Sequence, residues 1–229
     1  MLNVTNLTVA YGQSEVIHGI SFKAKHKETL AIMGRNGMGK STLFKSLIGV
    51  MAVRTGRVEV GDSDVSGKPS YQRVAEGLAY VPQGRMIFPN LTVEENIATG
   101  LETRKDKIIP QDIYALFPVL FDMRRRKGGN LSGGQQQQLA IARALVSEPK
   151  VLLLDEPTEG IQPSIIKDIA KVLNEIKKMR DITIVVSEQV LSFALDVADR
   201  ILVIEKGHLI HVENRANVDA AKISSYLAV

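Results

Sequence analysis

The segment from Thr29 to Ser41 constrains the fold of this 229-residue chain more than any other. An apolar run, Thr29–Met33, has the character of a buried strand and is followed by Gly34-Arg-Asn-Gly-Met-Gly-Lys-Ser41. Beyond it, residues 40–50 place Leu43, Phe44, Leu47 and Ile48 at helical spacing. A strand that enters a helix through a glycine-rich turn is a unit of parallel-sheet proteins, so an α/β fold is expected.

The same turn has the chemistry of a phosphate site. Its glycines permit positive φ and bring backbone N–H groups close to an anion, and the helix that follows adds its N-terminal N–H groups and dipole. Lys40 supplies a mobile positive charge for the outer phosphates, and the Ser41 hydroxyl is a hard oxygen ligand for Mg²⁺. The residues expected to bind ATP here are Gly34, Arg35, Asn36, Gly37, Met38, Gly39, Lys40, Ser41 and Thr42.

A second apolar run, Val151–Leu154, ends in two carboxylates, Asp155 and Glu156. The carboxyl ends of parallel strands form the ligand edge of such a sheet, so both side chains should face the phosphates. Asp155 is expected to hold Mg²⁺ with Ser41, and Glu156 to orient an attacking water as the catalytic base. Together with Lys40 they indicate hydrolysis rather than passive nucleotide binding.

The order of elements predicts a single domain over residues 1–229, with a mainly parallel sheet flanked by helices. Alternating residues predict strands at residues 2–9 and 16–22, and an N-terminal antiparallel strand region is expected ahead of the phosphate loop. Residues 84–139 lack strand patterns and are expected to form an inserted helical subdomain. The remaining expected strands are residues 78–81, 151–154, 182–187 and a pair near 200–211, and the remaining helices are 135–147, 164–179 and 191–198.

Leu131-Ser-Gly-Gly-Gln135 stands between the phosphate loop and Asp155, at the start of an amphipathic helix. With the two phosphate-site motifs it resembles the signature of the ABC ATPases, and the resemblance covers nearly the whole chain. It implies that Leu131, Ser132, Gly133, Gly134 and Gln135 bind the ATP of a partner subunit, so that two ATPase subunits close over two nucleotides.

The resemblance assigns further roles. It places Tyr11 against the adenine ring, and Gln83 at Mg²⁺, at the attacking water and in signalling to the membrane subunits. It implies that the helical insertion receives coupling helices from two integral membrane permeases, which in importers work with an extracytoplasmic solute-binding protein. The expected location is therefore the cytoplasmic face of the membrane, as a peripheral subunit.

Two positions depart from the usual pattern. Most family members carry a histidine after the strand that follows Asp155, whereas this chain has Gln189, which can donate a hydrogen bond to phosphate but cannot carry a proton. The loop after Glu156 has Gln162 where an aspartate is usual. Catalysis is therefore expected to depend more on Glu156, with Gln189 in the place of the histidine.

These departures, with Pro82-Gln-Gly-Arg85, resemble the uptake ATPases for branched-chain amino acids and their relatives. The run from Glu159 to Asp168 is most similar to the urea importer's ATPase, so the leading hypothesis is urea import. The alternatives are branched-chain amino acid import, export, or a nucleotide-sensing module without transport. DNA-repair and translation-factor ATPases of the family fit less well, because they carry coiled-coil insertions or paired ATPase domains.

Composition excludes several other classes. The chain has no cysteine, which rules out disulfides and thiol catalysis, and no apolar run approaches the roughly 20 residues of a membrane-spanning helix. The first residues do not resemble a signal peptide. A net charge of +4 without a basic stripe interleaved with aromatic residues predicts no nucleic-acid partner.

Overall fold

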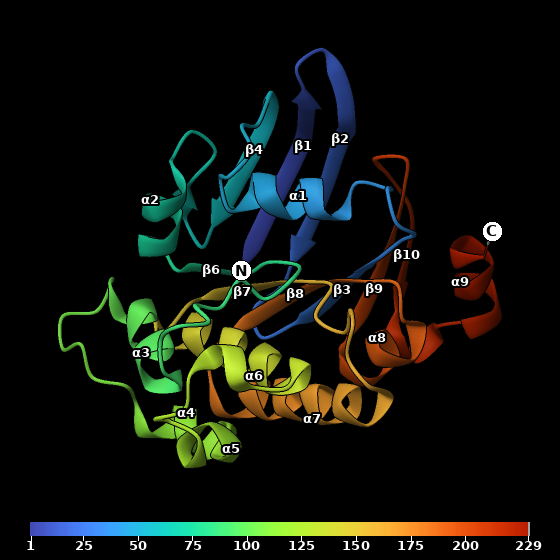
Figure 1. The fold of residues 1–229 in the computed structure, drawn as a ribbon. Coiled ribbons are helices and arrows are strands. Elements are labelled where there is room, and N and C mark those ends of the chain that lie inside the picture. Colours follow the sequence, from blue (N-terminus) through green and yellow to red (C-terminus); the bar gives the residue numbers. More distant parts are fainter. Residues whose placement is uncertain (229) are drawn as a thin grey trace.

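The computed structural model describes residues 1–228, which fold into two sheets with helices between and beside them (Figure 1). The first sheet is antiparallel, in the order β2-β1-β4-β5. Its strands are β1 (Leu2–Tyr11), β2 (Ser14–Ala24), β4 (Thr55–Val60) and β5 (Ser63–Asp64). This sheet contains the expected N-terminal strand region and extends it by two strands from later in the chain.

The second sheet has the order β10-β9-β3-β8-β7-β6 and is parallel except for its edge strand β10. Its strands are β3 (Thr29–Met33), β6 (Leu78–Val81), β7 (Val151–Asp155), β8 (Thr183–Glu188), β9 (Arg200–Glu205) and β10 (His208–Asn214). The predicted mainly parallel sheet is confirmed, and β3 and β6 have the bounds that the sequence indicated.

Strands β3, β7 and β8 of this sheet are buried on both faces, which explains their continuous apolar runs. Along β3, Leu30 and Ile32 join one core, whereas Ala31 and Met33 join the other, as the alternation of a strand requires. The first core lies under the antiparallel sheet and includes α1 (Lys40–Leu47), which runs between the two sheets. The second core lies under α6 (Gly133–Leu145), α7 (Pro163–Met179) and α8 (Leu191–Val197).

Residues 84–132 carry short helices and no strand, in agreement with the expected helical character of this region. They are α3 (Val93–Ala98), η1 (Thr99–Leu101), α4 (Gln111–Leu116), α5 (Pro118–Asp122) and η2 (Gly128–Asn130). The signature helix α6 begins inside the predicted insertion and continues past residue 139 into the second core. The helix predicted at residues 135–147 therefore begins and ends two residues later than the observed α6.

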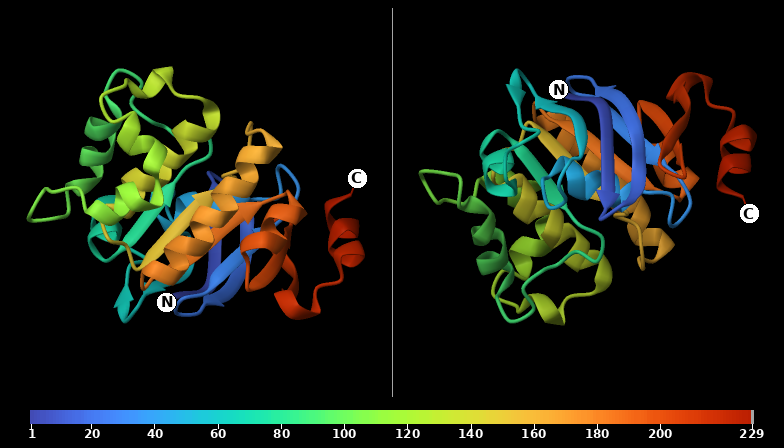
Figure 2. Two further views of the ribbon diagram at one scale, coloured as in Figure 1. Left: turned by 90° about the horizontal axis from the view of Figure 1, so that it is seen from below. Right: turned by 90° about the horizontal axis from the view of Figure 1, so that it is seen from above.

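Residues 51–77 were not assigned to elements in advance, whereas residues 213–229 were expected to have helical character. Residues 51–77 form β4, β5 and a short helix α2 (Ser70–Ala75), and the C-terminal part adds η3 (Arg215–Asn217) and α9 (Ala220–Leu227). Figure 2 shows the helices of residues 93–122 and the C-terminal helix α9 at opposite ends of the molecule. Within residues 1–228, no helix is both long and apolar enough to cross a bilayer.

Candidate active site

The glycine-rich loop leaves β3 and enters α1, as the motif requires. Gly37 has φ 78° and Gly39 φ 103°, a left-handed backbone that side chains other than glycine rarely adopt. At Gly39 space is also short, because an added Cβ would lie 2.9 Å from Cδ1 of Ile17. An added Cβ at Gly34 would lie 2.6 Å from the carbonyl oxygen of Ile204. The loop is therefore fixed by its backbone and by the strands packed behind it.

Lys40 is almost completely buried at the centre of this loop. Its Nζ donates to the carbonyl oxygens of Gly34 (2.6 Å) and Arg35 (2.9 Å), and it lies 2.9 Å from Oε1 of Glu156. A buried ammonium needs such partners, because an unpaired charge away from water is costly. The phosphate loop and the carboxylate after β7 are thus joined through one side chain.

Asp155 ends β7 in a ring of hydroxyl donors. Its Oδ1 accepts from Ser187 (2.6 Å) and Ser41 (3.2 Å), and its Oδ2 accepts from Tyr80 (3.1 Å). Burial raises the pKa of Asp155, an effect that these hydrogen bonds partly offset. Burial also raises the pKa of Tyr80, so that its hydroxyl remains a donor. Sequence reasoning placed Ser41 beside Asp155 but missed Tyr80 and Ser187.

Glu156 has a left-handed backbone, with φ 47°, and its N–H donates to both the carbonyl and the hydroxyl oxygen of Ser187 (3.1 Å each). This turn points the side chain back toward the phosphate loop, where Oε2 accepts from Nε2 of Gln83 at 3.4 Å. The predicted catalytic residues Lys40, Gln83 and Glu156 therefore meet at one place. They line a cavity of about 250 Å³, together with Val16, Asn36, Gly37, Gly39, Ser41 and Thr42.

Tyr11 lies at the end of β1 beside this cavity. Its hydroxyl is 3.5 Å from Oγ1 of Thr42, and 54% of the residue is exposed, which leaves a ring face open for a flat ligand. Two further loop residues contact the C-terminal part of the chain: the side chain of Arg35 donates to the carbonyl of Ala228 (3.2 Å), and the carbonyl of Met38 accepts from the N–H of Gly207 (3.1 Å).

Gln189 follows β8 and is exposed to solvent. It does not line the phosphate cavity. Its backbone is held by Glu188, whose Oε2 accepts from the N–H groups of Gln189 (3.0 Å) and Val190 (3.1 Å) and whose Oε1 accepts from Thr158. Burial raises the pKa of this carboxyl. Glu188 thus ties the end of β8 to the loop after Glu156, a role that sequence reasoning missed because no motif marks it.

The signature residues build the start of α6 and do not line the phosphate cavity of their own chain. Ser132 and Gln135 form a reciprocal capping box: Ser132 N–H donates to Oε1 of Gln135 (2.9 Å), and the N–H of Gln135 donates to Oγ of Ser132 (3.4 Å). Gly134 is packed so closely on α7 that an added Cβ would lie 2.3 Å from Cγ2 of Ile165. If Leu131 to Gln135 bind ATP, as the resemblance implies, that ATP must belong to a second subunit.

Hard oxygen donors suited to Mg²⁺ converge next to the phosphate cavity. Oγ of Ser41 and Oδ1 of Asp155 are 3.2 Å apart, and both belong to the ligand types that Mg²⁺ prefers. Within residues 1–228, no group of three or more histidine, aspartate or glutamate side chains is placed to hold a metal by itself. This donor set fits an ion shared with nucleotide phosphates rather than a cage made by the protein alone.

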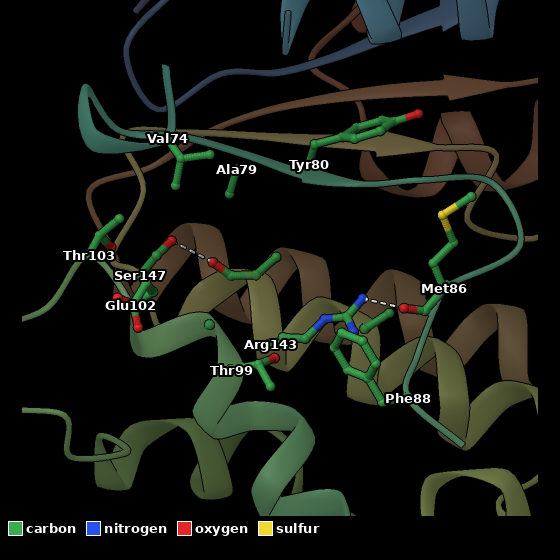
Figure 3. A pocket seen from close by; sticks show the side chains of 13 residues that line it. Val74, Ala79, Tyr80, Met86, Phe88, Thr99, Glu102, Thr103, Arg143 and Ser147 are labelled. Atoms are coloured by element: carbon green, nitrogen blue, oxygen red, sulfur yellow. Dashed lines mark hydrogen bonds between the residues drawn. The ribbon is translucent and has the colours of Figure 1, made fainter. Parts of the chain in front are cut away.

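A second cavity, of about 390 Å³, opens between β6, α6 and the helices of the insertion (Figure 3). Met86 and Phe88, on the segment that follows Gln83, are 68% and 48% exposed at its rim. The other lining residues are Val74, Ala79, Tyr80, Thr99, Gly100, Glu102, Thr103, Ala140, Arg143, Ala144 and Ser147. The groove therefore adjoins the phosphate site through Tyr80 and the Gln83 segment.

A phosphate loop, a buried lysine and paired carboxylates at the carboxyl edge of a parallel sheet define an ATPase of the phosphate-loop class. The family model described as ABC transporter matches residues 17–159. The chain belongs to the ABC transporter family and is an ABC-type ATPase cassette, which confirms the resemblance seen in the sequence.

Relatives cover almost the whole chain. The high-affinity branched-chain amino acid transport ATP-binding protein BraG of Pseudomonas aeruginosa is 38% identical, over 92% of this chain and 91% of that protein. The probable branched-chain amino acid transport ATP-binding protein LivF of Archaeoglobus fulgidus is 35% identical, over 91% and 90%. The lipopolysaccharide export system ATP-binding protein LptB of Haemophilus influenzae is 32% identical, over 92% and 89%.

The fold also matches solved structures. An ATP-binding cassette of an ABC transporter superposes with a TM-score of 0.85 at 26% identity, covering 100% of this chain and 99% of that one. A nucleotide-free ATP-binding cassette from an ABC transporter superposes with a TM-score of 0.81 at 26% identity, covering 99% and 94%. The two-sheet architecture is thus that of the ABC cassette.

Proposed function

We propose that this chain is the ATP-hydrolysing subunit of a transporter that takes up branched-chain amino acids. The observation that carries the proposal is the similarity to BraG and LivF, two proteins of different organisms whose names give this transport and which align nearly end to end with the chain. The export protein LptB matches over a similar length at lower identity.

Urea import, the leading hypothesis from the sequence, rests on one loop, residues 159–168. That loop contacts the protein's own Gln83 segment through Arg85. Similarity over the whole chain is a stronger basis than one loop for assigning the transported solute. We therefore prefer branched-chain amino acids, and the experiment below also tests urea.

Nucleotide binding would begin with an exchange of partners at Lys40. Its Nζ now lies against Glu156 Oε1 and two loop carbonyls, so the outer phosphates would replace the carboxylate as its counter-charge. Tyr11 would cover the adenine ring, and the loop N–H groups from Gly37 to Thr42 would hold the phosphates. The exchange releases Glu156 at the moment when the γ-phosphate arrives.

The released Glu156, held by Gln83 at 3.4 Å, would orient water for in-line attack on the γ-phosphorus and accept its proton. Ser41 and Asp155 would hold Mg²⁺, which neutralises charge on the β- and γ-phosphates when bound. Gln189 would donate a hydrogen bond to a phosphate oxygen from the end of β8, which lies beside the phosphate loop because Gly34 N–H donates to the carbonyl of Glu188 (3.1 Å).

The working species would be a dimer of ATPase subunits. Gly133 and Gly134 start α6, where the helix dipole and the first N–H groups suit an anion, and the phosphate cavity of the same chain is elsewhere. A second cassette, either a copy of this chain or a related subunit, would supply the missing side of each ATP site.

The groove beside β6 would receive a coupling segment of a membrane permease. It is apolar at the rim, where Met86 and Phe88 are exposed, and it lies next to the Gln83 segment, so that movement in the groove would reach the ATP site. Two permeases, with an extracytoplasmic solute-binding protein, would place the chain at the cytoplasmic face of the membrane.

The test is uptake of radiolabelled leucine and urea by a strain that lacks this chain, restored with the wild type or with Glu156→Gln. We expect the wild type to restore leucine uptake and the variant to fail, because hydrolysis falls by about 10² or more without the base. ATP affinity of the purified variant should stay near that of the wild type, since Lys40 and the loop are intact.

Membrane proteins that copurify with the tagged chain should include two permeases. Restored urea uptake with unchanged leucine uptake would favour urea, and recovery of no membrane protein would favour a nucleotide-sensing role. Full leucine uptake with Glu156→Gln would contradict the assignment of the base.

A further inference from the structure

Three consecutive residues after Gln83 have a left-handed backbone. The φ angles are 78° for Gly84, 67° for Arg85 and 47° for Met86. Glycine adopts this region freely, but arginine and methionine do so at a cost, so neighbouring groups must hold them there.

Arg143 of α6 holds this backbone. Its NH2 donates to the carbonyl oxygens of Met86 (2.9 Å) and Arg85 (3.3 Å), and Figure 3 shows the guanidinium directed at Met86 from the helix. Its guanidinium carbon lies 5.4 Å from the centre of the Phe88 ring. The conformation of the segment after Gln83 therefore depends on the helix that carries the signature.

The side chain of Arg85 reaches the loop that follows Glu156 and the first turn of α6. Its NH2 donates to the carbonyl oxygen of Glu159 (3.0 Å) and lies 3.4 Å from that of Gly160, in the loop that follows Glu156. Its NH1 would lie 3.3 Å from a Cβ added to Gly133, so the guanidinium also covers the first turn of α6. Arg85 does not line the phosphate cavity and touches none of the groups placed there.

We propose that Arg85 is a positioning residue that couples the Gln83 segment to the loop after Glu156 and to the signature turn. The inference rests on the proposed function, since it concerns coupling in the assembled transporter. A movement of the segment at the groove would shift Arg85, and through its guanidinium it would shift residues 159–160 and Gly133 together. The planar guanidinium group of arginine suits this coupling, because its several N–H donors bond neighbouring carbonyl oxygens in a fixed geometry.

We expect the coupling to require arginine at position 85. Arg85→Gln removes the charge and shortens the side chain, whereas Arg85→Lys keeps the charge but has no planar fork. Arg125→Gln is the matched control, because Arg125 is exposed and its side chain has no hydrogen bond or ion pair with residues 1–228.

The first measurement is made on the isolated chain and does not depend on the transported solute. Hydrogen exchange of the peptide covering residues 157–163 should be about tenfold faster in Arg85→Gln, since its carbonyl anchors are lost. ATP affinity should stay within about twofold of the wild type, because the phosphate cavity is untouched. Equal exchange in Arg85→Gln and Arg125→Gln would overturn the inference, and so would a tenfold loss of ATP affinity.

The second measurement uses the complex with its copurified permeases. We expect Arg85→Gln to lower kcat for ATP by about tenfold at similar KM and to raise the number of ATP molecules used per solute transported. Arg85→Lys should recover less than half of the lost rate. Full rescue by lysine would show that the charge alone matters, and an unchanged ratio of ATP to solute would show a merely structural role; either result overturns the proposal. A wild-type complex without solute-dependent hydrolysis would instead contradict the proposed function.

Discussion

Asp155 lies in surroundings that oppose a charge on its carboxyl group. The side chain is 2% exposed, and the dominant effect on its carboxyl is loss of solvent, which raises the pKa above the ordinary value of 3.8. Three hydroxyl donors compensate in part, and a divalent cation would compensate further. The site therefore retains an energetic cost in the protein that ligand binding would relieve.

The raised pKa of Asp155 predicts how the free energy of unfolding depends on pH. A folded-state pKa above the unfolded value means that the folded state binds the proton more tightly, so stability from this group increases as pH falls through the raised pKa toward 3.8. Asp155→Asn has no charge at any pH. Its advantage over the wild type in free energy of unfolding should therefore be largest near neutral pH and shrink on acidification.

Urea denaturation without nucleotide and with a chelator, between about pH 4 and pH 8, measures this difference. Asp122→Asn, which removes an exposed carboxylate at the end of α5, is the matched control. A difference that is constant with pH, or that grows on acidification, would contradict the role of burial.

Among the elements, fully buried strands and helices with a regular apolar period were the most predictable. In α7 the buried residues Ile169, Ala170, Leu173 and Ile176 follow helical spacing, and its predicted and observed bounds differ by one residue. By contrast, β4 buries only Val58 and Val60, and α2 is six residues long without a side-chain cap, so residues 51–77 gave no clear pattern. These elements form because the antiparallel sheet and β6 offer them a place to pack.

The contact between α6 and α7 is an element-scale feature that can be tested at Gly134. An added methyl group would lie 2.3 Å from Cγ2 of Ile165, so Gly134→Ala should destabilise the protein by about 1–3 kcal/mol through overpacking. The measurement is the free energy of unfolding from chemical denaturation.

The compensating variant Gly134→Ala/Ile165→Ala should recover much of the loss, because it removes the clashing side chain. Gly133→Ala is a suitable comparison, since its nearest neighbour is the flexible end of Arg85 at 3.3 Å. Equal destabilisation by both single substitutions would argue against close helix packing as the cause.

At the scale of the whole molecule, the groove of Figure 3 joins parts that are distant in the sequence. Val74 comes from α2, Ala79 from β6, Thr99 and Thr103 from the insertion, and Arg143 from α6. Met86 and Phe88 are exposed at its rim. Aromatic side chains are common among the residues that contribute most to binding at interfaces, so Phe88 is the candidate anchor for a permease.

Phe88→Asp should weaken association with the permeases by about tenfold or more, while ATP affinity of the isolated chain stays unchanged. Co-purification from detergent extracts, quantified against the wild type, is the measurement. Tyr71→Asp provides the control, because Tyr71 is a 70% exposed aromatic residue outside the groove. Equal recovery of permeases with both variants would place the docking surface elsewhere.

The sequence by itself determined the class of fold and the chemistry of the centre. A strand, a glycine-rich turn and a helix are local, so the phosphate loop was readable from residues 29–50 alone, as were the carboxylates that end β7. Tertiary structure alone decided that Tyr80 and Ser187 complete the ring around Asp155, and that Arg85 reaches the loop after Glu156. These contacts join strands and loops through the order of strands in the sheet, and no local periodicity encodes which side chains that order brings together.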